Sequence, residues 1–509
     1  MKNTRILALV LAVLMVAALF VGCSNTENPA DTTAATTTAA TTTAATTTEA
    51  TTTEATTTEA TTTEATTTEA TTTEATTTEA TTTEPATPDF GGYVFTFGTT
   101  ENKYLYATDE AGNPASALDE EWADAYAELE DTYNFTFDFK TANERSMEDA
   151  MLMVLAGDYA YDAQDLRTAQ LFPLATRGCM VNFASDEMLA AGVDVYDPEL
   201  FYQPVTQWTN ILGGVWGVRV ASKYYLPEFG YVMLFNKQLC DEAGYPADTL
   251  YDMVRNHEWN FTVYKDLCSK LAKDLDGDGV NDIWGTGGGS NPYGSEIMLA
   301  GGNAISEIDG KLVYTLDSEK SMDGLQFMSD EFWSGWRFVT GGASETRELF
   351  AAGKVGMAWA AGSWCTNPVI TGSEIDYGIL PMPVADDRED YVDCLSTPRV
   401  LCMFNGNCDY DVNVQILKLW ADVMTDTENW KDTYCEKFCR GQEVDLEMLC
   451  DYVLPKIQFG TYKLTTEMES LVESECIYAI QDDHITPAQA VEAVVAKAQD
   501  MLDKTFNQK

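Results

Sequence analysis

LFAAGKVGMAWAAGSW, running from Leu349 to Trp364, is the stretch that decides the fold. Ser344 is placed to cap a short helix that ends at Gly353, since glycine suits the left-handed turn after a helix. From Val355 to Ala360, large apolar side chains alternate with Gly and Ala, a pattern that predicts a buried strand. Open α/β sheets bind ligands at the carboxyl ends of their strands, which is where Trp364 falls. We therefore expect Trp364 either to contact a ligand or to anchor the core.

The N-terminus has the pattern of an export signal. Lys2 and Arg5 precede an apolar run from Ile6 to Phe20, which is followed by Val-Gly-Cys ending at Cys23. This ending resembles a bacterial lipoprotein signal covering residues 1–22, in which Cys23 receives lipid and becomes the mature N-terminus; plain secretion is the alternative. No later apolar run is long enough to span a membrane, so we expect the lipid to be the only membrane attachment.

A Thr-rich repeat follows the signal. TTTAA passes into TTTEA from Thr32 to Glu84, and almost no large apolar side chain interrupts it. Consecutive β-branched residues disfavour helix and no core can form, so we expect residues 23–88 to be a disordered tether. Its random-coil span would be roughly 40 Å. Dense Thr also permits O-glycosylation.

Composition excludes some partners and makes some sites improbable. The formal net charge is -51, with 81 acidic against 30 basic side chains, so the surface repels nucleic acid. The twelve cysteines are scattered without a CxxC pair, and His257 and His484 are the only imidazoles. We therefore expect buried free thiols rather than a disulfide framework or a metal cluster.

The part of the chain after Asp89 opens with a β-α-β rhythm. Strands are predicted from Tyr93 to Phe97, across the alternating Phe135–Phe139 run and from Tyr161 to Leu166, with helices between them. This alternation argues for a parallel sheet wrapped by helices. Arg167 and Gln170 would lie at the exit of the third strand, on the side where a ligand binds. Arg167 as an ordinary surface or capping charge is the alternative.

An acidic loop, KDLDGDGVNDIWG, offers a possible cation site. Asp274, Asp276, Asp278 and Asp282 match the start and the ninth position of a calcium loop, but Gly285 stands where a bidentate Glu should close it. Two interpretations stay open, a bound structural calcium and a solvated turn. No other cofactor is expected.

Several motifs, taken in order, resemble family 1 extracellular solute-binding proteins, the receptors of bacterial ABC importers. They are LFNKQLCDEAG, WNFT, DLDGDGVNDIWG, LAGGN, LFAAGKVGMAWAAGSW, YGILPMPV and TPAQAVEAVVAKAQDML. The resemblance implies an α/β, two-lobe periplasmic-binding-protein fold of the type II kind with a hinge. It implies crossings near Lys223–Gly230 and Ile379–Pro383, so that lobe one holds residues 89–224 and 384–426, and lobe two 225–383 and 427–509.

The same resemblance implies a site between the lobes. Trp364 matches an aromatic residue that stacks on a sugar, and Ser290, Asn291 and Tyr293 fall where such proteins often place further contacts. Indole suits the apolar face of a pyranose, while polar side chains bind the hydroxyl groups. The implied partners are a small-molecule solute, most simply a mono- or oligosaccharide, and an ABC permease, with the protein acting as a monomer.

Two other classes of function are alternatives to a binding protein. A surface glycan hydrolase would need a pair of carboxylates in space, and an adhesin would suit the tether. Neither G-x-S-x-G nor H-E-x-x-H occurs in the chain, and an adhesin leaves the two-lobe pattern unexplained. We therefore expect a lipid-anchored binding protein on the outer face of the cell membrane, without enzymatic activity.

Overall fold

The computed structural model describes residues 87–99, 104–142, 147–157, 161–221, 229–288, 294–338, 342–395, 399–424 and 430–507. The expected signal, Cys23 and nearly all of the Thr-rich tether lie outside the described residues. No helix among the described residues is long and apolar enough to cross a membrane.

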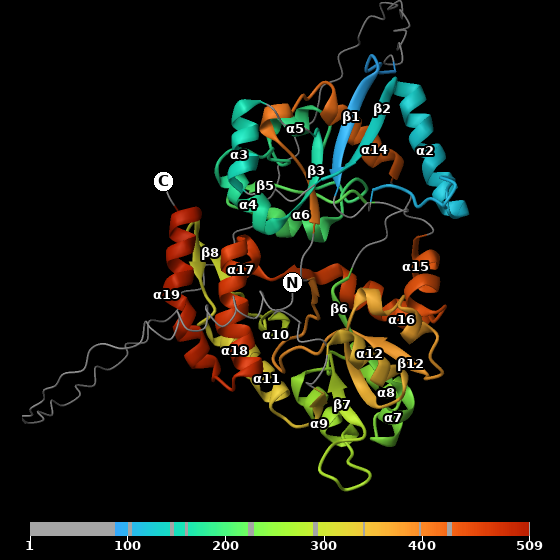
Figure 1. Cartoon of the computed structure of the whole chain (residues 1–509), viewed down its shortest axis with the longest axis vertical. Helices are drawn as coiled ribbons and strands as arrows, with labels where there is room; N and C mark the ends of the chain where they lie inside the picture. Colours follow the sequence, from blue (N-terminus) through green and yellow to red (C-terminus); the bar gives the residue numbers. More distant parts are fainter. Residues whose placement is uncertain are drawn as a thin grey trace, which may run out of the picture. The chain divides into compact units, whose positions relative to one another are not determined.

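The first of two main sheets has the strand order β14-β3-β1-β2. Its strands are β1 (Tyr93–Thr99), β2 (Phe135–Thr141), β3 (Ala163–Arg167) and β14 (Arg399–Met403). β1 pairs in parallel with β2 and β3, whereas β14 returns from late in the sequence and runs antiparallel to β3. The three strands expected from the β-α-β rhythm are therefore confirmed, and β14 completes the sheet (Figure 1).

The second sheet has the order β10-β7-β11-β6-β12 and places the deciding stretch at its centre. Its strands are β6 (Tyr231–Asn236), β7 (Trp284–Gly287), β10 (Arg337–Phe338), β11 (Val355–Ala361) and β12 (Tyr377–Leu380). β7, β10 and β11 are parallel, and β6 runs antiparallel to both β11 and β12. Two open sheets with helices between their strands confirm the α/β class.

Helices surround each sheet. Around the first sheet lie α2 (Ala117–Tyr133), α3 (Met147–Ala156), α4 (Thr168–Thr176), α5 (Asp186–Ala190), α6 (Gln203–Thr209) and α14 (Asn413–Met424). Those that follow β6 are α7 (Lys237–Glu242), α8 (Ala247–Arg255), α9 (Phe261–Leu271), α10 (Ser295–Leu299), α11 (Glu319–Phe332), α12 (Ala343–Ala351), α13 (Pro368–Thr371), α15 (Trp430–Cys439), α16 (Glu443–Glu447), α17 (Thr466–Val472), α18 (Tyr478–Asp482) and α19 (Pro487–Thr505).

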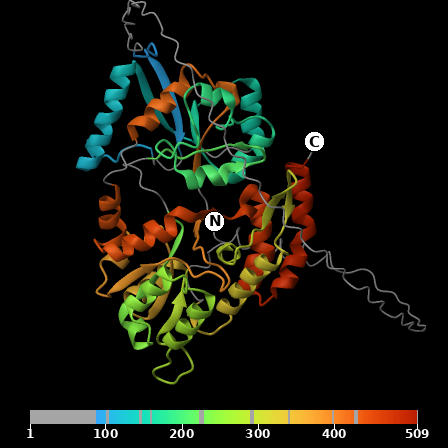
Figure 2. The ribbon, with the colours of Figure 1, turned by 180° about the vertical axis from the view of Figure 1, so that it is seen from behind.

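Three short strand pairs complete the description. They are β4 (Asn210–Ile211) with β5 (Gly214–Val215), β8 (Ile305–Ile308) with β9 (Lys311–Tyr314), and β13 (Asp393–Leu395) with β15 (Ile457–Phe459). The C-terminal helix α19 packs beside α17 and β9, and both views show this group together (Figures 1 and 2). The expected capping box of Thr486 and Gln489 opens α19 as predicted.

The deciding stretch forms the strand that its pattern predicts, but its helix begins differently. Gly353 has φ +70° after α12, as expected for a glycine that ends a helix. Ser344 is not the cap: Gly342 occupies that position and no side chain caps α12, so Ser344 lies in the first turn. β11 is buried on both faces, and a Cβ on Gly356 would lie 2.7 Å from the side chain of Leu271. The small residues of β11 therefore allow α9 to pack close to the sheet.

The chain leaves the second sheet later than the resemblance implied. Ile379 and Leu380 pair with β6, and the indole of Trp259 donates to the Pro381 carbonyl at 3.0 Å. Val384 bridges Asn260, and Ala385, Tyr391, Val392 and Cys394 pack in the same core as β6 and α9. The return to the first sheet falls between Leu395 and Arg399, so residues 384–395 belong with lobe two, and Ile379–Pro383 is not a crossing.

Asp393 ties two of the crossings together. Its buried carboxylate accepts the Gly230 amide at 2.8 Å and the Tyr231 amide at 3.1 Å, where the chain enters the second sheet. Burial raises the pKa of Asp393 to about 7, although these amide donors oppose the rise. The residue lies only a few positions before the chain returns to β14. One side chain therefore fixes the entry to lobe two beside its exit.

The start of β7 packs against α9 with no room for a side chain. The Gly285 amide donates to the Trp336 carbonyl at 2.9 Å, and a Cβ on Gly285 would lie 2.1 Å from the Cys268 carbonyl oxygen. Gly285 is the position at which a calcium loop would carry its closing Glu. Close packing of β7 on α9 is the physical reason why that position holds glycine.

We expect Gly285→Ala to destabilise the protein by about 1–3 kcal/mol or more, because the clash is with backbone and cannot be relieved by a rotamer change. Gly342→Ala is the control, since a Cβ there meets nothing within 4 Å; it should cost only the preference of the α12 N-cap for Gly over Ala, about 1 kcal/mol or less. Denaturant unfolding of both variants would measure the difference. Equal stability of the two variants would contradict the close packing of β7 on α9.

Candidate ligand-binding site

The carboxyl end of β3 brings together buried polar groups from three strands. The Thr99 hydroxyl donates to Asp165 at 2.8 Å, and Nη1 of Arg399 lies 4.0 Å from the other oxygen of Asp165. All three side chains are less than a tenth exposed. β1 and β3 end at this edge and β14 begins there. This is the edge at which open α/β sheets bind ligands.

Arg167 and Gln170 lie at the same edge. Arg167 is the last residue of β3 and the residue before α4, where its side chain is exposed and makes no capping bond. Gln170 is half-buried in the first turn of α4. Ser290, Asn291 and Tyr293 lie outside the described residues, so their role stays a prediction.

Arg219 joins this edge and was missed from the sequence. Its side chain is 2% exposed, and Nη2 donates to the Arg399 carbonyl at 3.2 Å. Asp165 and Arg399 were missed as well. A signal was present for Arg219, which interrupts the apolar segment VWGVRVA, and for Arg399, which precedes the apolar run VLCMF, whereas Asp165 stands in the polar stretch DAQDLR. Sequence alone did not show that three segments so distant from one another meet at one point.

Trp364 follows β11 in a short 3-10 turn, η1 (Gly362–Trp364), and is almost enclosed. It is 4% exposed and packs in the apolar cluster that contains Phe229, Cys365 and Tyr434. The Arg347 guanidinium lies 5.4 Å from the centre of its ring and also donates to the Ser344 hydroxyl. For a sugar to stack on Trp364, Arg347 or another neighbouring side chain has to move away.

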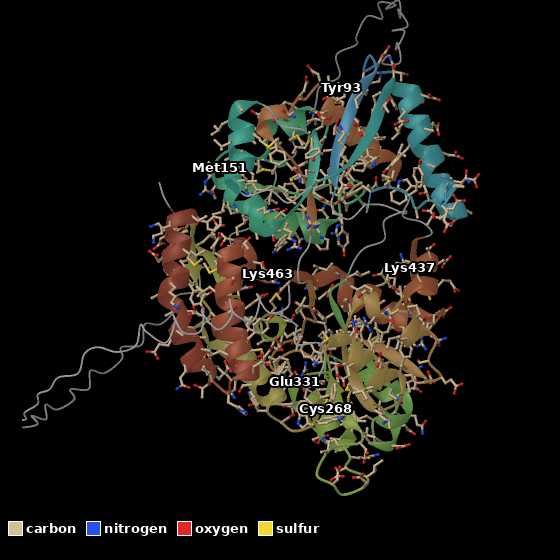
Figure 3. All side chains as sticks on the ribbon, viewed as in Figure 1. Tyr93, Met151, Cys268, Glu331, Lys437 and Lys463 are labelled. Atoms are coloured by element: carbon tan, nitrogen blue, oxygen red, sulfur yellow. The ribbon has the colours of Figure 1, made fainter. Side chains whose placement is uncertain are left out.

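A second buried polar network lies beneath β7 and β11. Glu331 forms an ion pair with Arg337 and accepts the Tyr264 hydroxyl at 3.0 Å, and the Trp359 indole donates to the same hydroxyl at 2.9 Å. Arg337 lies against Gly288, where a Cβ would be 3.2 Å from Nη2. Figure 3 shows Glu331 near Cys268 in the interior of this lobe. The network fixes the position of the backbone at the carboxyl end of β7.

Glu296, on α10, is a carboxyl group buried beside this network. It is 1% exposed, and neither of its oxygens has a hydrogen-bond partner in the part of the chain that the structure describes. Burial raises its pKa to about 8, the charge of Glu331 adds to the rise, and Arg337 opposes it. Glu296 is therefore held largely as the neutral acid at pH 7.

The acidic loop brings three of its four expected ligands together. Carboxylate oxygens of Asp274, Asp276 and Asp282 lie within 4.8 Å of one another, and Asp278 is not part of this group. Both oxygens of Asp274 already accept backbone amides, from Gly277 and Gly279. The donor set suits a hard cation in chemistry but lacks the closing carboxylate. Calcium at this loop stays a prediction.

The cysteines of the described chain are thiols. Every cysteine from Cys179 to Cys476 is free, and most are buried. Burial raises the pKa of Cys240 and of Cys365 to about 12, which keeps both as unreactive thiols near neutral pH. The expectation of buried free thiols is met by these residues.

Comparison with known proteins shows the fold. No protein-family model matches the chain, and no curated protein matches its sequence. Among solved structures, the substrate-binding protein Lmo0181 from Listeria monocytogenes, in complex with cycloalternan, matches with a TM-score of 0.51 at 15% identity, covering 82% of this chain and 100% of its own. The cyclo/maltodextrin-binding protein complexed with maltotetraose matches with a TM-score of 0.53 at 14% identity, covering 84% of this chain and 100% of its own.

A third solved structure has a different kind of ligand. UgpB from Mycobacterium tuberculosis, in complex with glycerophosphocholine, matches at a TM-score of 0.53 and 15% identity, covering 81% of this chain and 99% of its own. The described chain therefore has the two-lobe fold of ABC solute-binding proteins, as the resemblance implied. The ligands of these proteins range from cyclic and linear saccharides to a phosphodiester.

The burial of Glu296 predicts a specific pH dependence. A group whose pKa is raised in the folded state contributes stability below its unfolded pKa and loses that contribution as pH rises through its folded pKa. We expect the free energy of unfolding of the wild type to fall, relative to that of Glu296→Gln, as the pH rises from about 4.5 to about 8. At about 1.36 kcal/mol per unit of pKa shift, the loss would be up to a few kcal/mol. Thermal melts at pH 5 and pH 9 would measure this.

Glu492→Gln is the control, because Glu492 is exposed on α19. Its melting temperature should differ from that of the wild type by the same small amount at both pH values. A Glu296→Gln variant that behaves in the same way would contradict the neutral, buried state of Glu296.

Proposed function

We propose that this protein is an extracellular solute-binding protein that captures a small molecule between its lobes and delivers it to an ABC importer, without enzymatic activity. The observation that carries the proposal is the two-lobe fold, matched over four fifths of the chain by solute-binding proteins. The polar residues at the carboxyl end of β3 lie at the edge of the sheet where open α/β folds bind their ligands. Binding would draw the lobes together, and no bond would be broken.

The N-terminal sequence supplies the proposed location. Lipid on Cys23 would hold the protein to the outer face of the cell membrane, and the Thr-rich tether would keep the binding lobes clear of the surface. The permease is the proposed protein partner, and the protein would act as a monomer. The surface charge opposes binding to nucleic acid.

We propose a mono- or oligosaccharide as the solute. Support comes from two of the similar solved structures, which hold saccharides, and from Trp364 at the carboxyl end of β11. An indole supplies the flat apolar surface that a pyranose ring needs, and arginine and amide groups bind its hydroxyl groups.

A thermal-shift screen of the soluble part from Asp89 onward tests this function. The panel would contain mono- and oligosaccharides, peptides and polyamines. A saccharide at about a hundred times its dissociation constant should add about 2.7 kcal/mol of stability, because it binds only the folded state. The saccharide should be recovered unchanged after incubation, as chromatography would show. Consumption of the sugar would indicate a hydrolase, and a shift with peptides alone would contradict the saccharide.

Trp364→Ala tests the proposed stacking. The variant should bind the saccharide at least tenfold more weakly, because it loses the ring contact. Since Trp364 also packs in an apolar cluster, the variant should lose some thermal stability, but less than Trp359→Ala. Trp359→Ala is the comparison, since Trp359 is 1% exposed and hydrogen-bonded in the core, so its loss should cost about 3–5 kcal/mol. If Trp364→Ala loses as much stability as Trp359→Ala, Trp364 anchors the core and does not contact ligand.

A further inference from the structure

One edge of the second sheet lies where the chain enters lobe two. β6 begins at Tyr231, directly after the chain has come from lobe one, and Tyr231 pairs with Ala361 at the end of β11. β7 runs parallel to β11 and ends beside it at Gly287. Open α/β sheets bind ligands at the carboxyl ends of their strands. This edge is therefore the part of lobe two that is best placed to contact a ligand held between the lobes.

Arg347 reaches this edge from α12. The buried hydroxyl of Thr346 donates to the Gly288 carbonyl at 3.4 Å, which holds the first turn of α12 over the end of β7. The Arg347 guanidinium lies 5.4 Å from the centre of the Trp364 ring, and Trp364 follows β11 directly. Two elements that meet at the edge thus bring one cation onto one indole.

The contacts of Arg347 leave most of its hydrogen-bonding capacity unused. Nη2 donates to the Ser344 hydroxyl at 2.9 Å, whereas Nε is buried and has no acceptor among the described residues. No carboxylate pairs with Arg347 in the part of the chain that the structure describes, although the sequence has 81 acidic side chains. A guanidinium has five donors, and a buried donor without an acceptor costs free energy. An acceptor from outside the chain would therefore stabilise Arg347 at this edge.

Arg337 shows how differently a structural arginine of the same lobe is held. It is 2% exposed and forms an ion pair with the buried carboxylate of Glu331, an interaction that is costly to break. Arg347 is half-buried, and its contacts are a neutral hydroxyl and the face of a ring. Such contacts are weaker than a buried ion pair, so Arg347 can turn away from Trp364 at a lower cost.

We infer that Arg347 is a ligand-binding residue, which covers the Trp364 ring in this structure and turns to bind two adjacent hydroxyl groups of the saccharide that takes its place. The planar guanidinium presents parallel donors whose spacing matches two neighbouring oxygen atoms. The indole face that it leaves would meet the apolar face of the same sugar ring. This inference rests on the proposed saccharide-binding function and adds the residue of lobe two that binds hydroxyl groups.

Titration calorimetry with a defined set of sugars tests the inference. Maltotetraose, cellotetraose, xylotetraose and their monosaccharides would be titrated into the soluble part from Asp89 onward. Arg347→Met keeps a long apolar side chain and removes every donor, so it should bind each sugar that the wild type binds at least tenfold more weakly. Arg347→Lys keeps the charge without the paired donors and should not restore the affinity.

Lys354→Met is the matched control. Lys354 is exposed and lies immediately before β11, at the end of the strand opposite Trp364. The variant therefore removes one positive charge from the same lobe without changing the edge, and it should bind sugars like the wild type. Arg347→Met and Lys354→Met should both melt close to the wild type, because neither change breaks an ion pair among the described residues.

Fluorescence quenching by acrylamide adds a measurement that needs no sugar. The emission of Trp364 is the difference between a protein and the same protein carrying Trp364→Phe. Acrylamide should quench this emission more strongly in Arg347→Ala than in the wild type, because the smaller side chain uncovers the ring. Equal quenching in the two proteins would show that Arg347 does not cover Trp364 and would overturn the inference.

The binding data separate this inference from the proposed function. If a sugar binds the wild type and binds Arg347→Met as tightly or more tightly, Arg347 does not bind hydroxyl groups, and the solute-binding function still stands. If Arg347→Lys binds like the wild type, charge alone is sufficient and the paired donors are wrong. If no sugar of the set or of the wider screen binds the wild type, the inference fails together with the proposed saccharide.

Discussion

The buried carboxylate of Asp393 is the interaction on which the arrangement of the described chain depends. It accepts the amides of Gly230 and Tyr231 where the chain enters the second sheet, and it lies just before the chain returns to β14. A carboxylate without water needs such donors, and backbone amides at a strand start need such an acceptor. Each group therefore fixes the other, and with them two of the points at which lobe two is connected to lobe one.

The carboxyl ends of β3 and β7 are built in a similar way, from charged side chains that are buried and held by partners. Asp165 and Arg399 support the end of β3, and Glu331 and Arg337 support the end of β7. Removing one partner of such a pair leaves an uncompensated charge, so each pair is costly to break. The polar groups at both strand ends therefore have positions that are set by their buried partners.

Local patterns predicted the elements well because their causes are local. The strand of β11, the capping box of α19 and the glycine after α12 follow from side-chain alternation, hydroxyl capping and a positive φ, each set within a few residues. Ser344 was assigned as a cap wrongly because a hydroxyl in the first turn resembles one at the cap. The resemblance implied a crossing at Ile379–Pro383, but the pairing of β12 with β6 keeps Ile379 and Leu380 in the second sheet.

The sequence by itself determined the α/β class, the elements, the acidic surface and the exported, tethered organisation that we expect of the N-terminus. Only the tertiary structure decided the edge of the first sheet, because Arg167, Arg219 and Arg399 come from three distant segments and no spacing links them. It also decided that Trp364 lies beneath Arg347 and that Gly285 belongs to a strand packed on α9. Strand order and register are set by the burial of both faces of each sheet, which no single segment encodes.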